Sequence, residues 1–307
     1  MARKEEIDWK SKYDREHAIR VAAEELIEQK SLELFEAQLS IEKYAEKLEY
    51  EQKEMQDSIR YGARILNRLL PNEYIIQSSF PSSRVFFAPR DIVGGDFYWT
   101  HRMPDGSVIL AISDCTGHGV PGAFMSIMGI NQLNAIVPES IDSSPAGIIQ
   151  RLDREITHIL CEKNQSIGAL QDGMDIAIIR WFPQKRKLFA SSAHESVILQ
   201  KADVVELLPT TRHSIGGNLI SDKDYIDYEY ELDGGSRIFM FSDGFYDQIG
   251  GPRRSKFGKR RVLELIEAHV RESFSSQFGA VVDAFHEWRG DQDQVDDVTF
   301  IGIELTT

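Results

Sequence analysis

The residues with the clearest capacity for chemistry are four widely spaced aspartates, Asp96, Asp114, Asp243 and Asp296. Each stands at the end of a short segment whose apolar and β-branched composition is typical of a strand. A bare carboxylate at the tip of a buried strand is costly unless it is paired or bound to a metal. A ligand set made of oxygen, without histidine or cysteine, favours hard divalent ions, so we expect Mg²⁺ or Mn²⁺.

Small residues surround these aspartates. Asp96 follows two glycines, Asp114 opens a glycine-rich turn, and Asp243 stands between a serine and a glycine. Taken singly, each is most simply an ordinary turn aspartate. The set is better explained if the four strand ends converge on one edge of two facing sheets. One carboxylate shared by two ions would then place them about 3.5–4 Å apart, the arrangement used for displacement at phosphorus.

The elements that must position these side chains begin near residue 75. Short β-rich runs separated by turn residues predict strands at 84–88, 96–100, 108–113, 174–182, 187–191, 196–200, 225–232, 237–241 and 298–305. Helical patterns interrupt them at about 122–137, 145–161, 259–270 and 275–288. Strands joined by short turns predict antiparallel sheets, and helices gathered in groups predict a layered α+β domain.

The first 70 residues have a different composition. They contain no proline before Pro71, their only glycine is Gly62, and they are rich in strong helix formers. A mostly apolar seam with alternating spacings of four and three runs from Ile41 to Leu69, which favours a coiled coil. A continuous helix of this length would reach roughly 100 Å. A two-stranded parallel coil is the preferred interpretation; a helix folded back on itself and a single solvated helix are the alternatives.

The amino-acid composition of the chain excludes several classes of protein function. The 307 residues are 42% hydrophobic, enough for a substantial core, and carry a net charge of −14. That charge argues against nucleic acid or an anionic membrane surface as the main partner. The two cysteines, Cys115 and Cys161, form no framework, so a reducing compartment is expected. The charged amino terminus does not resemble a signal peptide, and we find no apolar run long enough to span a bilayer. We therefore expect a cytoplasmic protein.

Four segments carry a family resemblance. Residues 93–98, 113–123, 241–244 and 296–299 resemble, in the family's order, the metal-binding motifs of PPM-type protein phosphatases, and more narrowly those of the SpoIIE/RsbU branch. The likeness covers roughly residues 80–305. Four motifs in order are a strong signal, whereas any one of them would be weak. The resemblance implies an αββα sandwich of two mainly antiparallel sheets with the metals at one end.

The resemblance also implies roles for individual residues. Asp114 would bridge two Mn²⁺ or Mg²⁺ ions, and Asp96 would bind the second ion together with the backbone carbonyl of Cys115. Asp243 and Asp296 would bind the first ion. A hydroxide on the metals would attack phosphoserine or phosphothreonine in line. No phosphoenzyme would form, so no nucleophilic serine or cysteine is needed.

The chain departs from the family pattern at two points. Thr116 occupies the position where some members place a histidine as the proposed acid, which leaves the proton donor unassigned, with a water on the metal as our suggestion. Arg90 is a candidate for the missing phosphate-binding arginine, although a surface role fits it better. His118 is a candidate catalytic residue that would orient a water or tune Asp114, and a purely structural role is an equal alternative.

Other polar residues are interpreted more simply. Asp297 is expected to face outward or to act as a hydrogen-bonding neighbour of the site. Asp172 and Asp175 are expected to be turn residues at the start of a strand. His194 is expected to be a structural residue of a hairpin. None of these is expected to bind metal.

Organisation and partners follow from the same interpretation. We expect residues 1–70 to form a coiled-coil arm for homodimerisation and regulation, and residues 75–307 to form the phosphatase domain. The resemblance implies a phosphorylated STAS-type anti-sigma-factor antagonist as substrate. A catalytically inactive coiled-coil scaffold that binds phosphorylated partners is the alternative, and a small-molecule phosphatase is a weaker one. All four motifs that resemble the family's metal-binding motifs keep their aspartate, which favours an active enzyme over an inactive scaffold.

Overall fold

The structure, a computed structural model, describes residues 9–139, 144–161, 172–216 and 223–306. The chain forms two compact units that divide between Ser58 and Ile59. The assignment of residues 1–70 to an arm and 75–307 to a phosphatase domain remains a prediction. Each unit is described by itself below.

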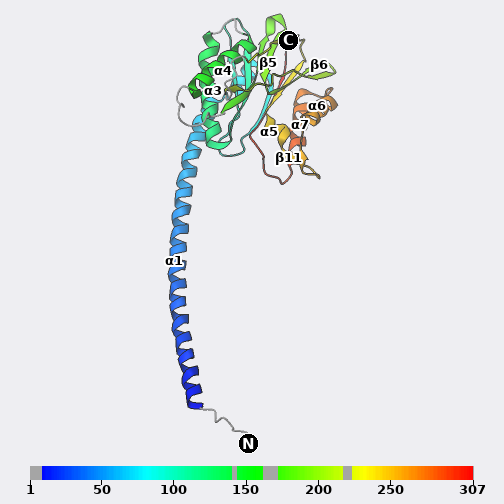
Figure 1. Cartoon of the computed structure of the whole chain (residues 1–307). Helices are drawn as coiled ribbons and strands as arrows, with labels where there is room; N and C mark the ends of the chain where they lie inside the picture. The colour runs from blue at the N-terminus through cyan, green and yellow to red at the C-terminus, as the bar shows by residue number, and fades with distance from the viewer. Residues whose placement is uncertain (1–8, 140–143, 162–171, 217–222, 307) are drawn as a thin grey trace. The chain divides into compact units, whose positions relative to one another are not determined.

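Two antiparallel sheets form the centre of the larger unit (Figure 1). The first has the order β1 (Ser82–Ala88), β13 (Val298–Glu304), β10 (Arg237–Phe241), β6 (Ser196–Lys201) and β7 (Val204–Leu207). The second has the order β2 (Phe97–Arg102), β3 (Val108–Cys115), β4 (Gly173–Phe182), β5 (Lys187–Ala193) and β9 (Tyr228–Glu231), with β8 (Ile215–Gly216) paired to β4. A separate two-stranded ribbon joins β11 (Ile249–Gly250) to β12 (Ser255–Lys256).

Helices cover the outer faces of the two sheets. Helices α3 (Gly119–Glu139) and α4 (Pro145–Cys161) cover the second sheet, and α6 (Lys259–Ala268) and α7 (Phe274–Arg289) cover the first (Figure 1). The short helices α2 (Glu73–Ser79) and α5 (Asp243–Asp247) and one 3₁₀ turn (Pro183–Lys185) complete the elements of the described chain. The predicted αββα sandwich of antiparallel sheets is therefore confirmed.

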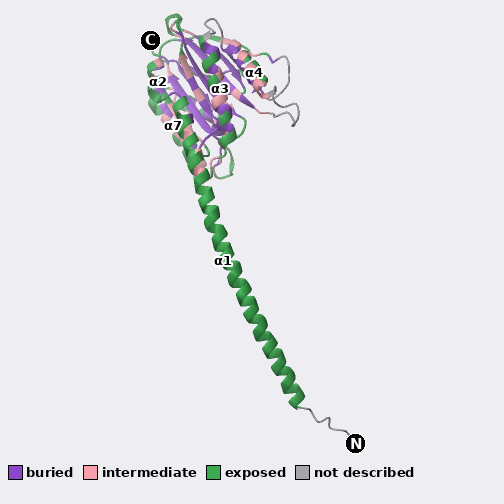
Figure 2. Cartoon of the chain, turned by 90° about the vertical axis from the view of Figure 1, so that its left-hand side faces the viewer, coloured by how far each residue is buried: buried purple, intermediate pink, exposed green. Residues whose placement is uncertain are grey.

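The apolar core has three layers. Figure 2 shows that the strands of the larger unit are mostly buried. Strand β3 illustrates how the layers arise, because successive side chains point to opposite faces of a sheet. Ile109 and Ala111 pack toward α3 and α4, whereas Leu110 and Ile112 pack between the two sheets. The third layer is rich in phenylalanine and joins the first sheet to α6 and α7. Strands buried on both faces make a rigid support for residues at their ends.

Helix α3 differs from the expectation that no segment is long and apolar enough to span a membrane. By length and composition its residues 119–138 meet that condition. Several of its side chains, among them Leu133, Ile136 and Val137, are buried in the layer shared with the second sheet. In this fold the apolar character of α3 is accounted for by core packing.

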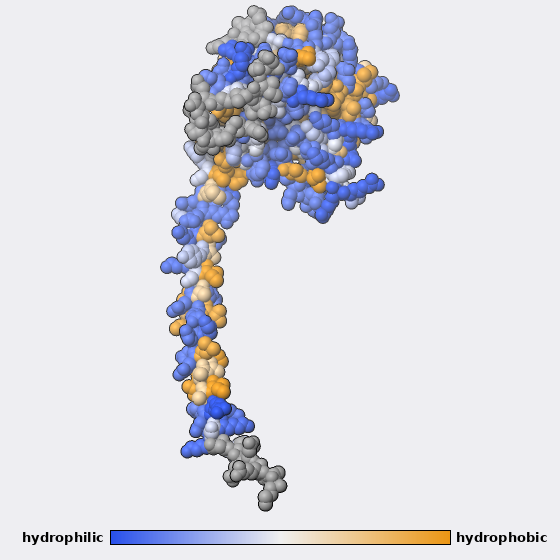
Figure 3. Space-filling model, in the orientation of Figure 1, coloured by the Kyte–Doolittle hydropathy of each residue, from blue (hydrophilic) through white to orange (hydrophobic). Residues whose placement is uncertain are grey.

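Helix α1 runs without interruption from Trp9 to Leu69, as the composition predicts. Most of its side chains are exposed, including Leu48 and Met55, and Figure 3 shows apolar side chains gathered along it. The end of the helix behaves differently, because Leu66 and the following Leu70 are buried in the core of the larger unit. The last turns of the apolar seam therefore belong to the core of the globular unit.

Our first prediction tests the close packing of α7 on β13. A Cβ atom added at Gly302 would lie 2.8 Å from Phe278 and 3.1 Å from Phe274. We expect Gly302→Ala to lower the free energy of unfolding by about 1–3 kcal/mol. Gly279, inside α7, has no atom within 4 Å of the corresponding position. Gly279→Ala should therefore raise stability by about 0.5–1 kcal/mol. Urea denaturation measures both, and equal effects of the two substitutions would contradict this packing.

Candidate metal centre

The structure brings together residues from the ends of both sheets. Asp96 immediately precedes β2, and Asp114 lies near the end of β3; these strands pair with Phe97 opposite Ser113. Asp243 follows β10, and Asp296 precedes β13. Hydrogen bonds from Ser242 and Thr299, residues of the first sheet, reach Asp96 of the second sheet and thereby connect the two groups.

Asp96 is the most firmly held of the four aspartates. Its Oδ2 atom accepts hydrogen bonds from Ser242 Oγ (2.6 Å) and Thr299 Oγ1 (2.7 Å), and Thr299 N donates to Ser242 Oγ (2.9 Å). The residue is 1% exposed, and its Oδ1 atom has no hydrogen-bond partner among the described residues. Burial raises the pKa of Asp96 to about 7, although both hydroxyl groups oppose that rise. One oxygen is thus fixed, and the other is left free for a ligand.

Asp114 and Asp243 interact with each other directly. Burial raises the pKa of Asp114 well above its usual value, and the charges of Asp96 and Asp243 raise it further. The pKa of Asp243 is also raised by burial, while a hydrogen bond with the Asp114 side chain opposes the shift. Two carboxyl groups share a hydrogen bond only when one of them carries a proton. A divalent cation would replace that proton and remove the repulsion.

Asp296 and Asp297 have different roles at the start of β13. Asp296 Oδ1 accepts a hydrogen bond from Asp297 N (2.8 Å), and the charge of Asp296 raises the pKa of Asp243, which places it beside the cluster. The side chain of Asp297 is buried and accepts from Arg90 N (2.7 Å) and Gly95 N (2.6 Å). The interpretation of Asp297 as outward-facing is therefore wrong, and that of a hydrogen-bonding neighbour is right: it fixes the segment that carries Asp96.

The Cys115 carbonyl oxygen lies close against the backbone of the segment that carries Asp96. A Cβ atom at Gly95 would lie 2.7 Å from Cys115 O and 2.8 Å from Gly117 O, so glycine is required for this approach. The Cys115 thiol is buried and free. Burial, followed by the charge of Asp114, raises its pKa well above the usual value, which keeps it a thiol and not a nucleophile. The chemistry available here is that of the carbonyl group.

His118 lies at the edge of the site. Its side chain is about half exposed, at 51%, and its Nδ1 atom is 2.9 Å from Asp91 Oδ2. This contact favours the tautomer that carries a proton on Nδ1 and leaves Nε2 available. Within the described residues, no hydrogen bond or ion pair joins His118 to the four aspartates. The structure therefore orients the ring without placing it inside the cluster.

The two departures from the family pattern have structural explanations. Thr116 is engaged with strand β4, because its Oγ1 accepts from Gly173 N (3.1 Å) and its own N–H donates to Gly173 O (2.9 Å). The Arg90 guanidinium donates from Nη1 to the backbone carbonyl of Val295 (3.0 Å). Both side chains have contacts that stabilise the loops around the site.

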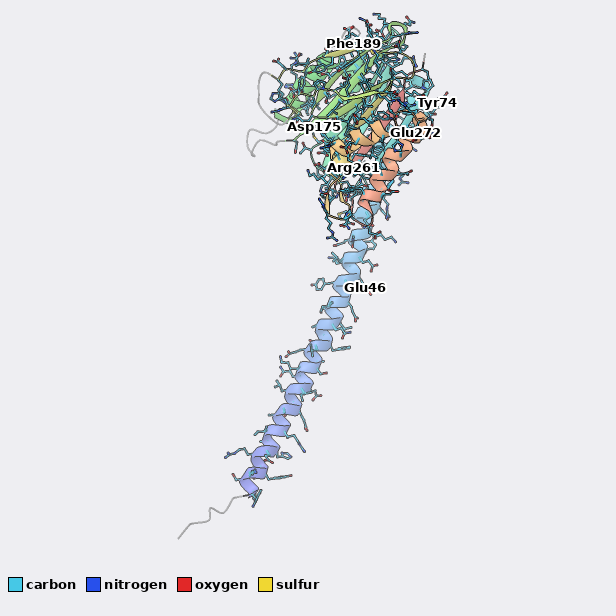
Figure 4. All side chains as sticks on the ribbon, turned by 90° about the vertical axis from the view of Figure 1, so that its right-hand side faces the viewer. Glu46, Tyr74, Asp175, Phe189, Arg261 and Glu272 are labelled. Carbon is cyan, nitrogen blue, oxygen red and sulfur yellow. The ribbon has the colours of Figure 1, made fainter. Side chains whose placement is uncertain are left out.

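Three further charged residues lie around the cluster, of which the sequence analysis misassigned one and missed two. Asp175, labelled in Figure 4, lies within β4. The strand pairing places it directly opposite Asp114, so its assignment to a turn is wrong. Glu195, in the β5–β6 turn, is 3% exposed. Burial raises the pKa of both Asp175 and Glu195, and Lys259, the first residue of α6, opposes that rise. His194 lies 3.8 Å from Asp175, through Nδ1 and Oδ2. A charged residue between small residues of a tight hairpin is the only sequence signal that could have indicated Glu195.

The residues present fit hard divalent cations. No group of three or more histidine, cysteine, aspartate or glutamate side chains in the described parts of the chain is already arranged to hold a metal ion, so the fit lies in the chemistry of the donors. The free Oδ1 of Asp96 and the oxygen-only side chains of the four aspartates are the kind of donor that Mg²⁺ or Mn²⁺ requires.

Our second prediction concerns the hydroxyl groups that fix Asp96. Thr299→Val keeps the shape of the side chain but removes the donor to Asp96 Oδ2, so the carboxylate is held by Ser242 alone. We expect the affinity for Mn²⁺, measured by titration calorimetry, to fall by about 10–100-fold. Thr100→Val removes a similar hydroxyl, whose partner is the carbonyl of Ile109, and should leave the affinity unchanged. Equal affinities of the two variants would contradict the role assigned to Thr299.

Comparisons with known proteins identify the family. The sequence model of the SpoIIE family (Stage II sporulation protein E) matches residues 104–306. No curated protein matches the chain. Among solved structures, the SiaA-PP2C domain of Pseudomonas aeruginosa is 29% identical and has a TM-score of 0.74, covering 83% of this chain and 98% of that one.

Two more distant structures share the fold. The RsbU and RsbW domains of a Mycobacterium tuberculosis protein are 17% identical with a TM-score of 0.56, covering 74% of this chain and 61% of that one. RsbX, solved in complex with magnesium, is 14% identical with a TM-score of 0.51, covering 73% of this chain and 94% of that one. The family match spans about two thirds of the sequence and includes three of the four aspartates. The chain therefore belongs to the SpoIIE family of PP2C-type protein serine/threonine phosphatases.

Proposed function

We propose that this phosphatase uses divalent metal ions to hydrolyse phosphoserine or phosphothreonine on a regulatory partner protein. The observation that carries the proposal is the arrangement of Asp96: one oxygen is held by two hydroxyl groups, and the other is buried without a partner beside the Asp114–Asp243 pair. Such an arrangement has no evident structural benefit, because a buried unpaired carboxylate destabilises a fold. A cation bound to the free oxygen of Asp96 would explain why the carboxylate is buried there.

The proposed ligands are Asp114 between two Mn²⁺ or Mg²⁺ ions, Asp96 and the Cys115 carbonyl on one of them, and Asp243 and Asp296 on the other. When bound, the ions would supply the attacking hydroxide from water and offset the charge of the phosphoryl group. The magnesium complex of RsbX, a protein with the same fold, supports a hard cation for this site.

Other residues of the chain would position the metal ligands and the reacting groups. Asp297 holds the N–H groups of Arg90 and Gly95, which keeps the Asp96 loop against the end of β3. His118, whose Nδ1 is engaged by Asp91, has Nε2 free to orient a water or the leaving oxygen at the mouth of the site. The cluster of carboxylates itself carries no group that binds phosphate, so the metal ions would have to do so.

The proposed partner is a phosphorylated STAS-type anti-sigma-factor antagonist. Its support is the resemblance to the RsbU branch, together with the structure that contains RsbU and RsbW domains, and it rests on analogy. We also propose a cytoplasmic location, for which the support is the absence of a cysteine framework in the sequence and the free thiol of Cys115.

Our third prediction tests activity. The full chain should hydrolyse p-nitrophenyl phosphate in the presence of Mn²⁺ and lose that activity with a chelator. Asp114→Ala should reduce kcat by at least about 10²-fold, because it removes the proposed bridging ligand from a preorganised site. Asp233→Ala, in the exposed turn before β10, serves as the matched control and should retain full activity. A Mn²⁺-dependent rate no higher than that of Asp114→Ala would favour an inactive scaffold that binds phosphorylated partners.

We further propose that α1 dimerises the chain as a parallel coiled coil with a second copy. Its seam residues Ile41, Leu48 and Met55 are all more than 60% exposed in the single chain. A helix gains most of its stability by burying an apolar face, so a helix of 61 residues with such a seam requires a partner surface. A second copy supplies the same seam in register.

Our fourth prediction tests this dimer. The full chain should have twice the mass of one chain in sedimentation equilibrium, and the double variant Leu48→Lys, Met55→Lys should be monomeric, because it places like charges at the seam. Tyr50→Lys adds the same charge two residues from Leu48, on the face away from the seam, and should leave the dimer intact. A double variant that remains dimeric would show that the seam does not form the interface.

A further inference from the structure

Glu195 is held in a tight turn between two strands of different sheets. It follows β5 and precedes β6, and its neighbour His194 has a backbone φ of 67°. This left-handed conformation is uncommon for residues other than glycine, and it reverses the chain at this point. His194 N donates to Thr211 O (3.1 Å), and Ser192 Oγ donates to Glu195 O (2.5 Å). The turn is therefore fixed, with the His194 side chain 44% exposed and Glu195 3% exposed.

The carboxylate of Glu195 is buried, and one of its two oxygen atoms, Oε2, has no hydrogen-bond partner in the described parts of the chain. An unpaired carboxyl group in the interior contributes nothing to packing that an apolar side chain would not supply better. A structural role for this side chain is therefore a poor explanation, and the side chain requires a ligand that is absent from the protein itself.

The strand pairing places Glu195 beside the metal centre. Strands β6 and β10 pair with Ser196 opposite Phe241, so Glu195 and Ser242 continue the register one residue beyond that pair. Ser242 is the residue that holds Asp96 Oδ2, and Asp243 follows it. On the other side, the β5–β4 pairing places Ala193 opposite Ile176, next to Asp175. Both neighbouring strands therefore carry an acidic group close to Glu195.

The electrostatics agree with this placement. Burial raises the pKa of Glu195 well above its usual value, and the charges of Asp96, Asp175 and Asp243 raise it further, in that order. Glu195 in turn raises the pKa of Asp114. Lys259, whose ammonium lies 4.3 Å from the centre of the Tyr246 ring, opposes the shift at Glu195 only partly. The space that Glu195 faces is therefore negatively charged from several elements at once.

We propose that Glu195 is a further acidic ligand of this metal centre, and that its free Oε2 atom helps to hold a divalent cation on the side of the cluster formed by β6 and β10. The inference rests on the proposed function. It deepens that proposal, because it adds a carboxylate from the β5–β6 turn to a set otherwise drawn from the loops beside β2, β3, β10 and β13. Two buried carboxylates with a free oxygen, Glu195 and Asp96, then have the same explanation.

The test compares the full-length protein with Glu195→Gln, which keeps the shape of the side chain and removes its charge. Mn²⁺ alone is the probe, with affinity measured by titration calorimetry and thermal stability measured with and without the metal. We expect the affinity for Mn²⁺ to fall by at least about tenfold. We also expect the melting temperature of the metal-free protein to rise, because one repelling charge is gone. Glu287→Gln, at an exposed position of α7, should change neither quantity.

The outcomes separate the two proposals. A Glu195→Gln variant with unchanged Mn²⁺ affinity, in a chain that binds the metal and is active, overturns the role of Glu195 and leaves the proposed function standing. An unsubstituted chain that does not bind Mn²⁺ overturns both. If Glu195→Gln does not fold, Glu195→Asp is measured instead; it keeps the charge but shortens its reach, and an unchanged affinity in that variant also overturns the proposal.

Discussion

The structure depends on one electrostatic constraint: carboxylates from both sheets are held close together where water is largely excluded. Asp96 and Glu195 are almost completely buried, and the pKa values of Asp96, Asp114, Asp243 and Glu195 are all raised, with burial as the first cause. Left to themselves these groups repel one another or retain protons, and both outcomes oppose folding. A fold that keeps this arrangement is stabilised whenever a cation enters, so metal binding and the integrity of the site are coupled.

The sandwich supplies the means of holding the charges in place. Two hydroxyl groups fix one oxygen of Asp96, two backbone N–H groups fix Asp297, and Gly95 allows the backbone to approach the Cys115 carbonyl. These contacts come from both sheets, whose central strands β3 and β10 are buried on both faces and therefore resist displacement. The proposed metal centre thus lies where loops of both sheets meet on a rigid support.

The fold class predicted from the sequence is confirmed, whereas the metal-binding role of the four aspartates remains a prediction. Each of these aspartates carries a local signal, because glycine, serine or a second aspartate stands beside it at one end of a strand. The sequence did not predict Glu195 or the place of Asp175, whose position depends on the strand register of β3, β4 and β5 and on no local pattern. The burial of the last turns of α1 could not be predicted either, because the apolar seam has the same spacing where Leu48 is exposed and where Leu66 is buried. The positions of Glu195 and Asp175 and the burial of Leu66 depend on contacts between segments far apart in the sequence. The local periodicity of the sequence does not predict such contacts.

The most direct test of the account is a crystal structure of the full chain soaked in Mn²⁺, with anomalous scattering measured at the manganese edge. The account predicts strong peaks bounded by oxygen atoms of Asp96, Asp114, Asp243 and Asp296, at metal–oxygen distances of about 2.0–2.2 Å, which six-coordinate hard cations of this size adopt. The absence of any peak at this end of the sandwich, with these four side chains directed away from a common point, would contradict it.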